Sequence, residues 1–148
     1  GALLIMNDRV DLALLLGADG VHLGQEDLPL AQARALAPDL LLGQSTHDVS
    51  QAFAAQEQGA DYVNLGPIFA TQTKTASSAP LGPGIIAAAA PGLQIPFTVM
   101  GGIKEHNLAQ VLERGARTVA VVTAVTAAPD VKQAAERLRM RILEGRRS

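Results

Sequence analysis

The segment Gly59-Ala60-Asp61-Tyr62-Val63-Asn64-Leu65-Gly66-Pro67 carries the clearest structural signal in the chain. The apolar run from Tyr62 to Leu65 predicts a buried strand, and the Gly66-Pro67 pair ends it. Glycine at position 59 suits the left-handed conformation just after a helix, and the small Ala60 fits a tight turn into the strand. Similar joints occur at residues 17–21 and 115–119. The chain therefore repeats one helix-to-strand unit.

Six βα units follow when these joints are extended in both directions. Strands are predicted at residues 3–6, 20–23, 40–43, 62–65, 97–100 and 118–122, and helices near residues 10–16, 29–36, 49–58, 83–90, 105–114 and 130–144. The strands are continuous apolar runs, which is typical of a parallel sheet covered on both sides. The Gly-rich dinucleotide turn that is usual in open doubly wound sheets does not follow the first strand. The sequence predicts an α/β fold, a (β/α)8 TIM barrel, with about six βα units present and the first two missing.

The composition fits an ordinary globular protein. The 148 residues are 48% hydrophobic and 18% charged, which suits a single domain over residues 1–148. A net charge of −2 and 3% aromatic residues argue against nucleic-acid binding. No apolar stretch approaches the ~20 residues of a membrane helix, so we expect no membrane partner. The absence of cysteine excludes disulfides and thiolate zinc sites, and we expect a cytoplasmic protein.

Every predicted strand is followed by polar or glycine residues. In chain order these are Asn7-Asp8, Gly24 to Asp27, Gln44 to His47, Thr71 to Lys74, Gly101-Gly102 and Thr123. In an α/β barrel, functional residues lie in the loops at this end of the strands. The fourth loop has the polar groups of an anion site, because two hydroxyls and a lysine occur within four positions. A solvated surface loop is the alternative for that segment taken alone.

Asp8 and Asp27 end neighbouring predicted strands, so their carboxylates can converge. Mg²⁺ is typically held by one or two carboxylates together with waters and phosphate oxygens, and this pair fits that pattern. The alternative is that each aspartate caps the following helix. The two roles are compatible with each other.

Gly101-Gly102 and Val122-Thr123 follow the last two predicted strands, where barrels frequently build a phosphate site. Glycine permits close backbone approach, although a tight βα turn would also explain the pair. His22 lies within a strand and is predicted to be a hydrogen-bonded core histidine. His47 and His106 lack the partner spacing of a zinc site.

Several linked motifs resemble the thiamine-phosphate synthase family. They are Asn7-Asp8-Arg9, Gly20 to Leu28, Gly43 to His47, Gly59 to Val63, Gly66 to Phe69, Thr71 to Lys74 and Gly101 to Ile103, in that order. The resemblance implies a (β/α)8 barrel that joins hydroxymethylpyrimidine diphosphate to a thiazole phosphate and releases pyrophosphate with Mg²⁺.

The resemblance also implies a role for individual residues. Asn7 and Ser45 would contact the pyrimidine, Asp8 and Asp27 would hold the metal, and Lys74 would reach the diphosphate. Thr71, Gln72 and Thr73 would surround the thiazole phosphate, and Gly102, Val122 and Thr123 would complete that pocket. Lys74 and Ser45 are the residues expected to act in catalysis. Departure of the diphosphate leaves a cation that the aminopyrimidine stabilises, so the enzyme needs to neutralise the leaving group and exclude water.

The chain departs from the family pattern at three places. It has no Gln-x-Arg-x-Lys segment, which we expect upstream of Gly1, and it has Thr123 and Met100 where the family often has serine and isoleucine. A span without the first two units would leave two strand edges unpaired, so we expect this span to be poorly soluble or to recruit the missing structure. A homo-oligomer is a further expectation. Two alternatives remain: a thiazole tautomerase of the same family, which would not need the aspartate pair or Lys74, and a non-catalytic phosphate-binding remnant.

Overall fold

The computed structural model describes residues 1–71 and 79–145, and within them it shows one parallel sheet flanked by helices. The strands are β1 Ile5–Asn7, β2 Gly20–Leu23, β3 Leu41–Thr46, β4 Tyr62–Leu65 and β5 Phe97–Val99. The helices are α1 Val10–Leu16, α2 Leu30–Leu36, α3 Val49–Glu57, α4 Gly84–Ala89, the short 3-10 turn η1 Ala90–Gly92, α5 Leu108–Leu112, α6 Thr123–Thr126 and α7 Val131–Gly145.

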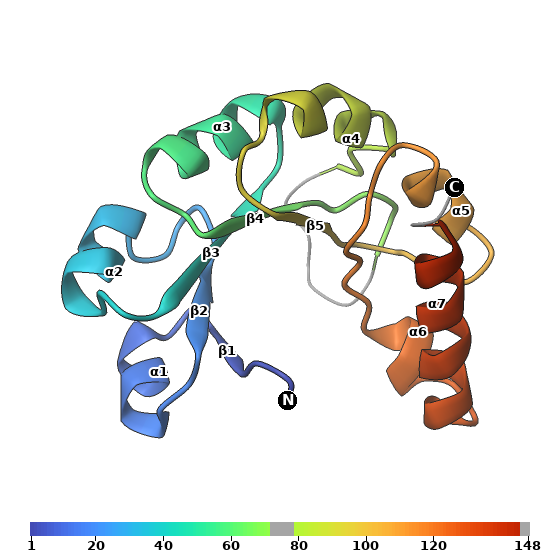
Figure 1. The fold of residues 1–148 in the computed structure, drawn as a ribbon, viewed down its shortest axis with the longest axis horizontal. Helices are drawn as coiled ribbons and strands as arrows, with labels where there is room; N and C mark the ends of the chain where they lie inside the picture. The colour runs from blue at the N-terminus through green and yellow to red at the C-terminus, as the bar shows by residue number, and fades with distance from the viewer. Residues whose placement is uncertain (72–78, 146–148) are drawn as a thin grey trace.

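The five strands pair in chain order, β1-β2-β3-β4-β5, and each pair is parallel. An open doubly wound sheet would reverse the strand order at a switch point, and these strands show no reversal. Figure 1 shows the strands along the inside of an arc and helices α1 to α4 along its outside. The predicted α/β class is confirmed, and the described strands form one parallel sheet without a reversal of strand order.

The two faces of the sheet differ in polarity. One face is mainly apolar and packs beneath the helices, with Thr46 as a fully buried polar exception. Its fully buried apolar side chains are Val21, Leu23, Leu42, Val63, Leu65 and Val99. Register places His22, Gly43 and Tyr62 in one row on the opposite, concave face, and Ser45, Asn64 and Thr98 in the next row. The strands therefore alternate in character, in contrast to the continuous apolar strands expected from the sequence.

Predicted and observed elements agree best at the repeated joints. The predicted ranges 10–16, 20–23 and 62–65 match α1, β2 and β4. Gly17, Gly59 and Gly115 all adopt positive φ, as their helix-ending role requires. Asp48 caps α3, since its Oδ1 accepts the Gln51 N–H at 2.7 Å.

The C-terminal third differs from the prediction. The strand expected at residues 118–122 is reduced to one bridge between Val99 and Val119, where the Ala120 N–H donates to the Val99 carbonyl at 2.9 Å. Helix α6 directly follows this segment and was not predicted. The helix expected at residues 105–114 forms only over Leu108–Leu112, because the Asn107 side chain accepts the Lys104 N–H in a turn before it.

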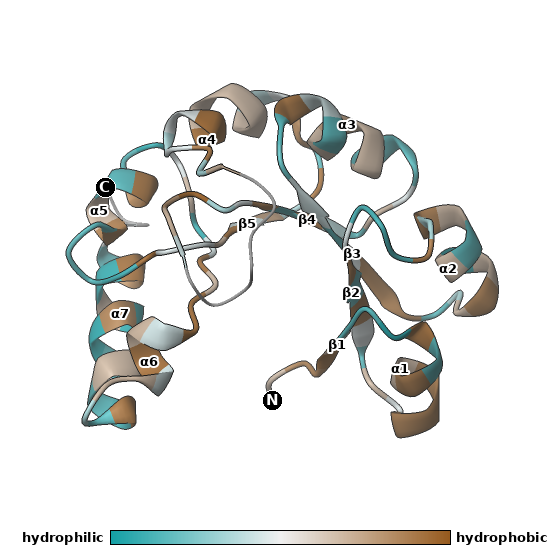
Figure 2. Ribbon diagram, turned by 180° about the vertical axis from the view of Figure 1, so that it is seen from behind, coloured by the Kyte–Doolittle hydropathy of each residue, from teal (hydrophilic) through white to brown (hydrophobic). Residues whose placement is uncertain are grey.

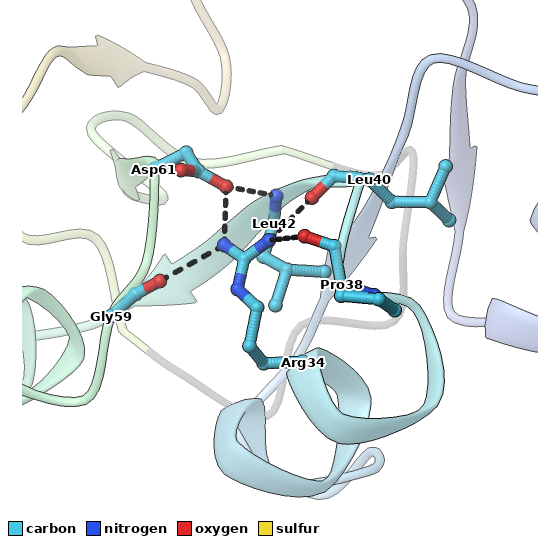
Figure 3. A network of polar contacts seen from close by, with 6 residues as sticks. All are labelled: Arg34, Pro38, Leu40, Leu42, Gly59 and Asp61. Carbon is cyan, nitrogen blue, oxygen red and sulfur yellow. Dashed lines mark hydrogen bonds and ion pairs between the residues drawn. The ribbon is translucent and has the colours of Figure 1, made fainter.

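Arg34, near the end of α2, forms hydrogen bonds with the residues that precede both β3 and β4 (Figure 3). Its guanidinium donates to Asp61 Oδ2 at 2.6 Å, and the same oxygen accepts the Leu42 N–H at 2.7 Å. It also donates to the carbonyls of Leu40, Pro38 and Gly59 at 2.8, 3.1 and 3.2 Å. Arg34 thus stabilises the end of the sheet opposite the carboxyl ends of the strands, and it does not stand in for the arginine of the missing family segment.

Exposed leucines gather beside the β1 edge. Leu15 on α1 is 79% exposed and Leu3 before β1 is 63% exposed. Figure 2 shows the apolar colouring of α1 and of the segment before β1. Leu4, Leu14 and Leu16, in the same two segments, are also exposed. Among the helices of the described ranges, none has the length and apolar character needed to cross a membrane.

Candidate functional site

The ends of β1 and β2 carry the two aspartates. Asp8 has a φ of 62°, and its N–H donates to the His22 carbonyl at 2.9 Å, so the chain turns sharply where β1 ends. Asp27 folds back over the end of β2, and its Oδ2 accepts the Gly24 N–H at 2.6 Å. Neither aspartate is a helix cap, because Arg9 and Pro29 occupy the N-cap positions of α1 and α2.

The chemistry of the two carboxylates suits Mg²⁺, which prefers one or two such oxygen ligands and keeps its remaining positions for water and phosphate. Because β1 and β2 are parallel neighbours, Asp8 and Asp27 lie in adjacent loops at the same edge of the sheet. No group of three or more His, Asp or Glu side chains within residues 1–71 and 79–145 is arranged to hold a metal by itself. A metal that needs a full protein cage, such as structural zinc, therefore has no site in these ranges.

Ser45 lies on the concave face beside β2 and β4. Its Oγ is 2.9 Å from His22 Nε2, and its carbonyl accepts a hydrogen bond from Gln25 Nε2 at 2.6 Å. Asn7 is paired in register with His22 and is exposed at the end of β1. Asn7 and Ser45, the two residues expected to contact a pyrimidine, thus lie on β1 and β3, the two strands that flank β2.

His22 is satisfied by hydrogen bonds, as predicted, but its place is different. It is half-buried on the concave face, with Nδ1 2.9 Å from the Tyr62 hydroxyl and Nε2 2.9 Å from Ser45 Oγ. The core position predicted from the apolar run is wrong, because the alternation of the strand turns this side chain away from the helices.

The loop after β4 runs along the end of β5. Ile68 N–H donates to the Met100 carbonyl at 2.8 Å, and Phe69 N–H donates to the Gly101 carbonyl at 3.0 Å. Gly102 has a φ of 63°, and a Cβ at this position would lie 2.4 Å from the Ala70 carbonyl oxygen. Glycine is therefore required here both for its conformation and for the close approach of the loop.

A cavity of about 560 Å³ opens between this loop and the segment after β5. Its lining residues are Phe69, Ala70, Thr71, Gly102, Lys104, His106, Asn107 and Thr123. Thr71, Gly102 and Thr123 are three of the residues predicted to surround a phosphate, and they meet here. Val122 is exposed and directly precedes α6 as its N-cap residue. Gln72, Thr73 and Lys74 lie outside the described residues.

Lys104 is a cavity residue that the sequence reasoning missed. Its amine donates to the Thr123 hydroxyl. Asn107 holds this corner, since its Oδ1 accepts the Lys104 N–H at 2.8 Å and its Nδ2 donates to the Gly102 carbonyl at 3.1 Å. The sequence does contain a signal for this residue: Lys104 comes two residues after Gly102, and Asn107 follows three residues later. An asparagine at that spacing can close a turn by accepting a backbone N–H with its side chain.

One ammonium group and several neutral donors face the same cavity. This combination suits a phosphate monoester, because an ammonium forms charge-assisted hydrogen bonds with phosphate oxygens and hydroxyls supply further donors. The fold and this site define a class, the parallel βα-repeat proteins with a polar site at the carboxyl ends of the strands. Within that class the chain belongs to the thiamine monophosphate synthase family, whose sequence model matches residues 1–125.

Individual relatives agree with this assignment. The chain is 48% identical over 140 residues to a thiamine-phosphate synthase of Pelotomaculum thermopropionicum, covering 94% of this chain and 64% of that protein. It is 50% identical over 139 residues to the corresponding protein of Chloroflexus aurantiacus, again covering 94% and 64%. A solved thiamine phosphate pyrophosphorylase from Pyrococcus furiosus superposes with a TM-score of 0.89 at 38% identity, covering 97% of this chain and 69% of that one. The chain thus spans slightly less than two thirds of the length of these two curated relatives, 64% of each.

Proposed function

We propose that the protein is a thiamine-phosphate synthase, a transferase that condenses hydroxymethylpyrimidine diphosphate with thiazole phosphate to give thiamine phosphate and pyrophosphate in thiamine biosynthesis. The observation that carries the proposal is the cavity in which Thr71, Gly102 and Thr123 meet beside Lys104. The family resemblance assigns the first three to the thiazole phosphate. Membership of the family supports the same reaction.

The complete fold in this proposal is a (β/α)8 barrel with two further βα units before residue 1. The curated relatives are longer than this chain, which covers 64% of the first of them. The leucines exposed beside the β1 edge give the additional units an apolar surface to cover, and the arc in Figure 1 is open on this side. The Gln-x-Arg-x-Lys segment that contacts the diphosphate belongs to the added part.

Mg²⁺ is the proposed cofactor, held by Asp8 and Asp27. When bound, the ion would neutralise charge on the diphosphate leaving group. The two carboxylates offer hard oxygen ligands at adjacent strand ends, which fits this ion.

In this proposal, different residues of the chain bind the two substrates. Lys104, Thr71 and Gly102 bind and orient the thiazole phosphate, while Asn7 and Ser45 hold the aminopyrimidine. The carbon–oxygen bond to the diphosphate breaks with its electron pair leaving on oxygen, and the thiazole nitrogen forms the new carbon–nitrogen bond. Lys74 interacts with the charge that develops on the leaving group, which raises turnover because the interaction is strongest in the transition state.

We further propose a cytoplasmic enzyme whose partners are these small molecules, with assembly into a homo-oligomer. Neither nucleic acid nor a membrane is part of this proposal.

The test is direct: the full-length protein, both substrates and Mg²⁺ should yield thiamine phosphate and pyrophosphate in equal amounts. Isomerisation of a thiazole carboxylate phosphate without any use of the pyrimidine diphosphate would instead identify a tautomerase. Binding of thiazole phosphate with no turnover of either kind would identify a non-catalytic remnant. A Ser50→Ala variant serves as the control for serine substitutions at the site, because Ser50 is exposed on α3 and its loss should leave the activity unchanged.

A further inference from the structure

We propose that Tyr62 and His22 are positioning residues that fix the direction of the Ser45 hydroxyl, so that Ser45 presents its hydrogen to the ligand on the concave face. The hydrogen bonds among these three side chains do not depend on which reaction the protein catalyses. Their link to catalysis rests on the proposed synthase activity.

The three side chains come from three adjacent strands and form one hydrogen-bonded series. The Tyr62 hydroxyl of β4 lies 2.9 Å from His22 Nδ1 of β2, and His22 Nε2 lies 2.9 Å from Ser45 Oγ of β3. The His22 and Tyr62 rings are 5.5 Å apart between centroids and inclined by 30°. Both ring nitrogens of His22 are therefore engaged by partners that are themselves fixed on the sheet.

Gly43 makes this series possible. It pairs in register with His22 on one side and with Tyr62 on the other, so it lies between them. A Cβ on Gly43 would lie 2.1 Å from Tyr62 Cζ and 2.4 Å from its hydroxyl oxygen. The tyrosine therefore reaches across β3 to His22 only because this position has no side chain. Gly43 has no positive φ, so the space, and not the backbone conformation, is what glycine supplies.

The direction of the hydrogen bonds follows from the chemistry of the three groups. Burial raises the pKa of Tyr62 above its usual value of 10, so the phenol remains a neutral O–H. A phenolic O–H donates readily to an imidazole nitrogen, which makes Nδ1 the acceptor. A neutral imidazole then carries its one hydrogen on Nε2, which donates to Ser45 Oγ. With its oxygen accepting from His22, the Ser45 hydroxyl has its own hydrogen available for an acceptor atom of the substrate.

The first experiment reads the histidine directly and needs no substrate. Nitrogen-15 NMR of the ring nitrogens of the full-length protein distinguishes the two neutral tautomers and the imidazolium. The chain carries three histidines within the sequence shown, and a His22→Gln variant assigns the signal of His22. We expect the Nε2–H tautomer at neutral pH, and a mixed population in Tyr62→Phe. An Nδ1–H tautomer, an imidazolium, or an unchanged His22 signal in Tyr62→Phe would overturn the proposal.

The second experiment is a double-mutant cycle on activity, with Tyr62→Phe made in both the parent and a Ser45→Ala background. We expect Tyr62→Phe to lower kcat about 10-fold in the parent, the effect of one hydrogen bond, with the KM for thiazole phosphate unchanged. In the Ser45→Ala background the same change should have less than about a twofold effect, because the group it directs is gone.

Equal effects of Tyr62→Phe in both backgrounds would show that the tyrosine acts independently of Ser45 and would refute the positioning role. If the parent protein has no synthase activity, the proposed function fails, whereas the NMR experiment still decides whether the hydroxyl is oriented as described.

Discussion

Substitution of Gly102 by alanine tests whether the loop after β4 is held in place by its contact with the end of β5. The φ of 63° at Gly102 is a conformation that costs alanine roughly 1–2 kcal/mol. In addition, the new Cβ would lie 2.4 Å from the Ala70 carbonyl oxygen and 2.8 Å from Phe69 Cβ. The loop must therefore move.

Gly17 supplies a matched control for the conformational cost. It has the same φ of 63° at the end of α1, and a Cβ there would meet nothing within 4 Å. Gly17→Ala should lower the free energy of unfolding by roughly 1–2 kcal/mol and leave activity unchanged. Gly102→Ala carries the same cost and also requires the Ala70 carbonyl to retreat by about 1 Å to reach the 3.4 Å of an ordinary contact.

The extra displacement should appear in function. Thr71 follows Ala70 directly and lines the cavity, and a misplacement of about 1 Å in a binding group can cost about 100-fold in rate. We expect Gly102→Ala to lower kcat/KM for thiazole phosphate by roughly this factor. The assays are urea denaturation for stability and steady-state kinetics with thiazole phosphate varied. Parent-like kinetics in Gly102→Ala, or an equal loss in Gly17→Ala, would refute the reasoning.

Four further predictions concern single side chains. Lys104→Met should raise the KM for thiazole phosphate by about 10- to 100-fold through loss of a charge-assisted hydrogen bond, while Lys132→Met, 86% exposed on α7, should leave it unchanged. Lys74→Ala should lower kcat by about 100-fold with a much smaller change in thiazole phosphate binding, as kinetics with each substrate varied would show. Asp27→Ala should lower turnover and raise the Mg²⁺ concentration needed for half-maximal rate, and an unchanged requirement would remove Asp27 from the metal site. Arg34→Met should lower the free energy of unfolding by about 2 kcal/mol, a value that allows for the 35% exposure of the side chain, with kcat unchanged in the folded fraction.

The sequence predicted most reliably what is encoded locally. The glycines after α1, α3 and α5 mark a conformation that other residues rarely adopt, so the joint before β4 and the two similar joints were predicted correctly. Thr71, Gly102 and Thr123, which follow three different predicted strands, line one cavity. Their common location follows a topological rule, because parallel strands place their carboxyl ends on one edge wherever they lie in the chain.

The failures concern pairing between distant segments. Whether residues 118–122 become a strand depends on their partners, and a single bridge to Val99 forms here. The polarity of the concave face was missed for the same reason. Register decides which residue of a strand faces the helices, and a short run such as Gly20 to Leu23 carries too few residues to reveal an alternation. Lys104 was missed because it lies in a turn whose shape depends on the Asn107 side chain.

The two halves of the candidate site are held by different means, and this determines how they are coupled. Ser45 and His22 lie on paired strands, so the sheet fixes their positions. The phosphate cavity is bounded by a loop that begins at Gly66. There, the Gly66 carbonyl accepts a hydrogen bond from His47 Nδ1 at 2.6 Å, and the Gly66 N–H donates to the Thr46 carbonyl at 3.1 Å. The residues immediately after Ser45 therefore anchor the start of the loop, and the distance between the two halves is set by β3.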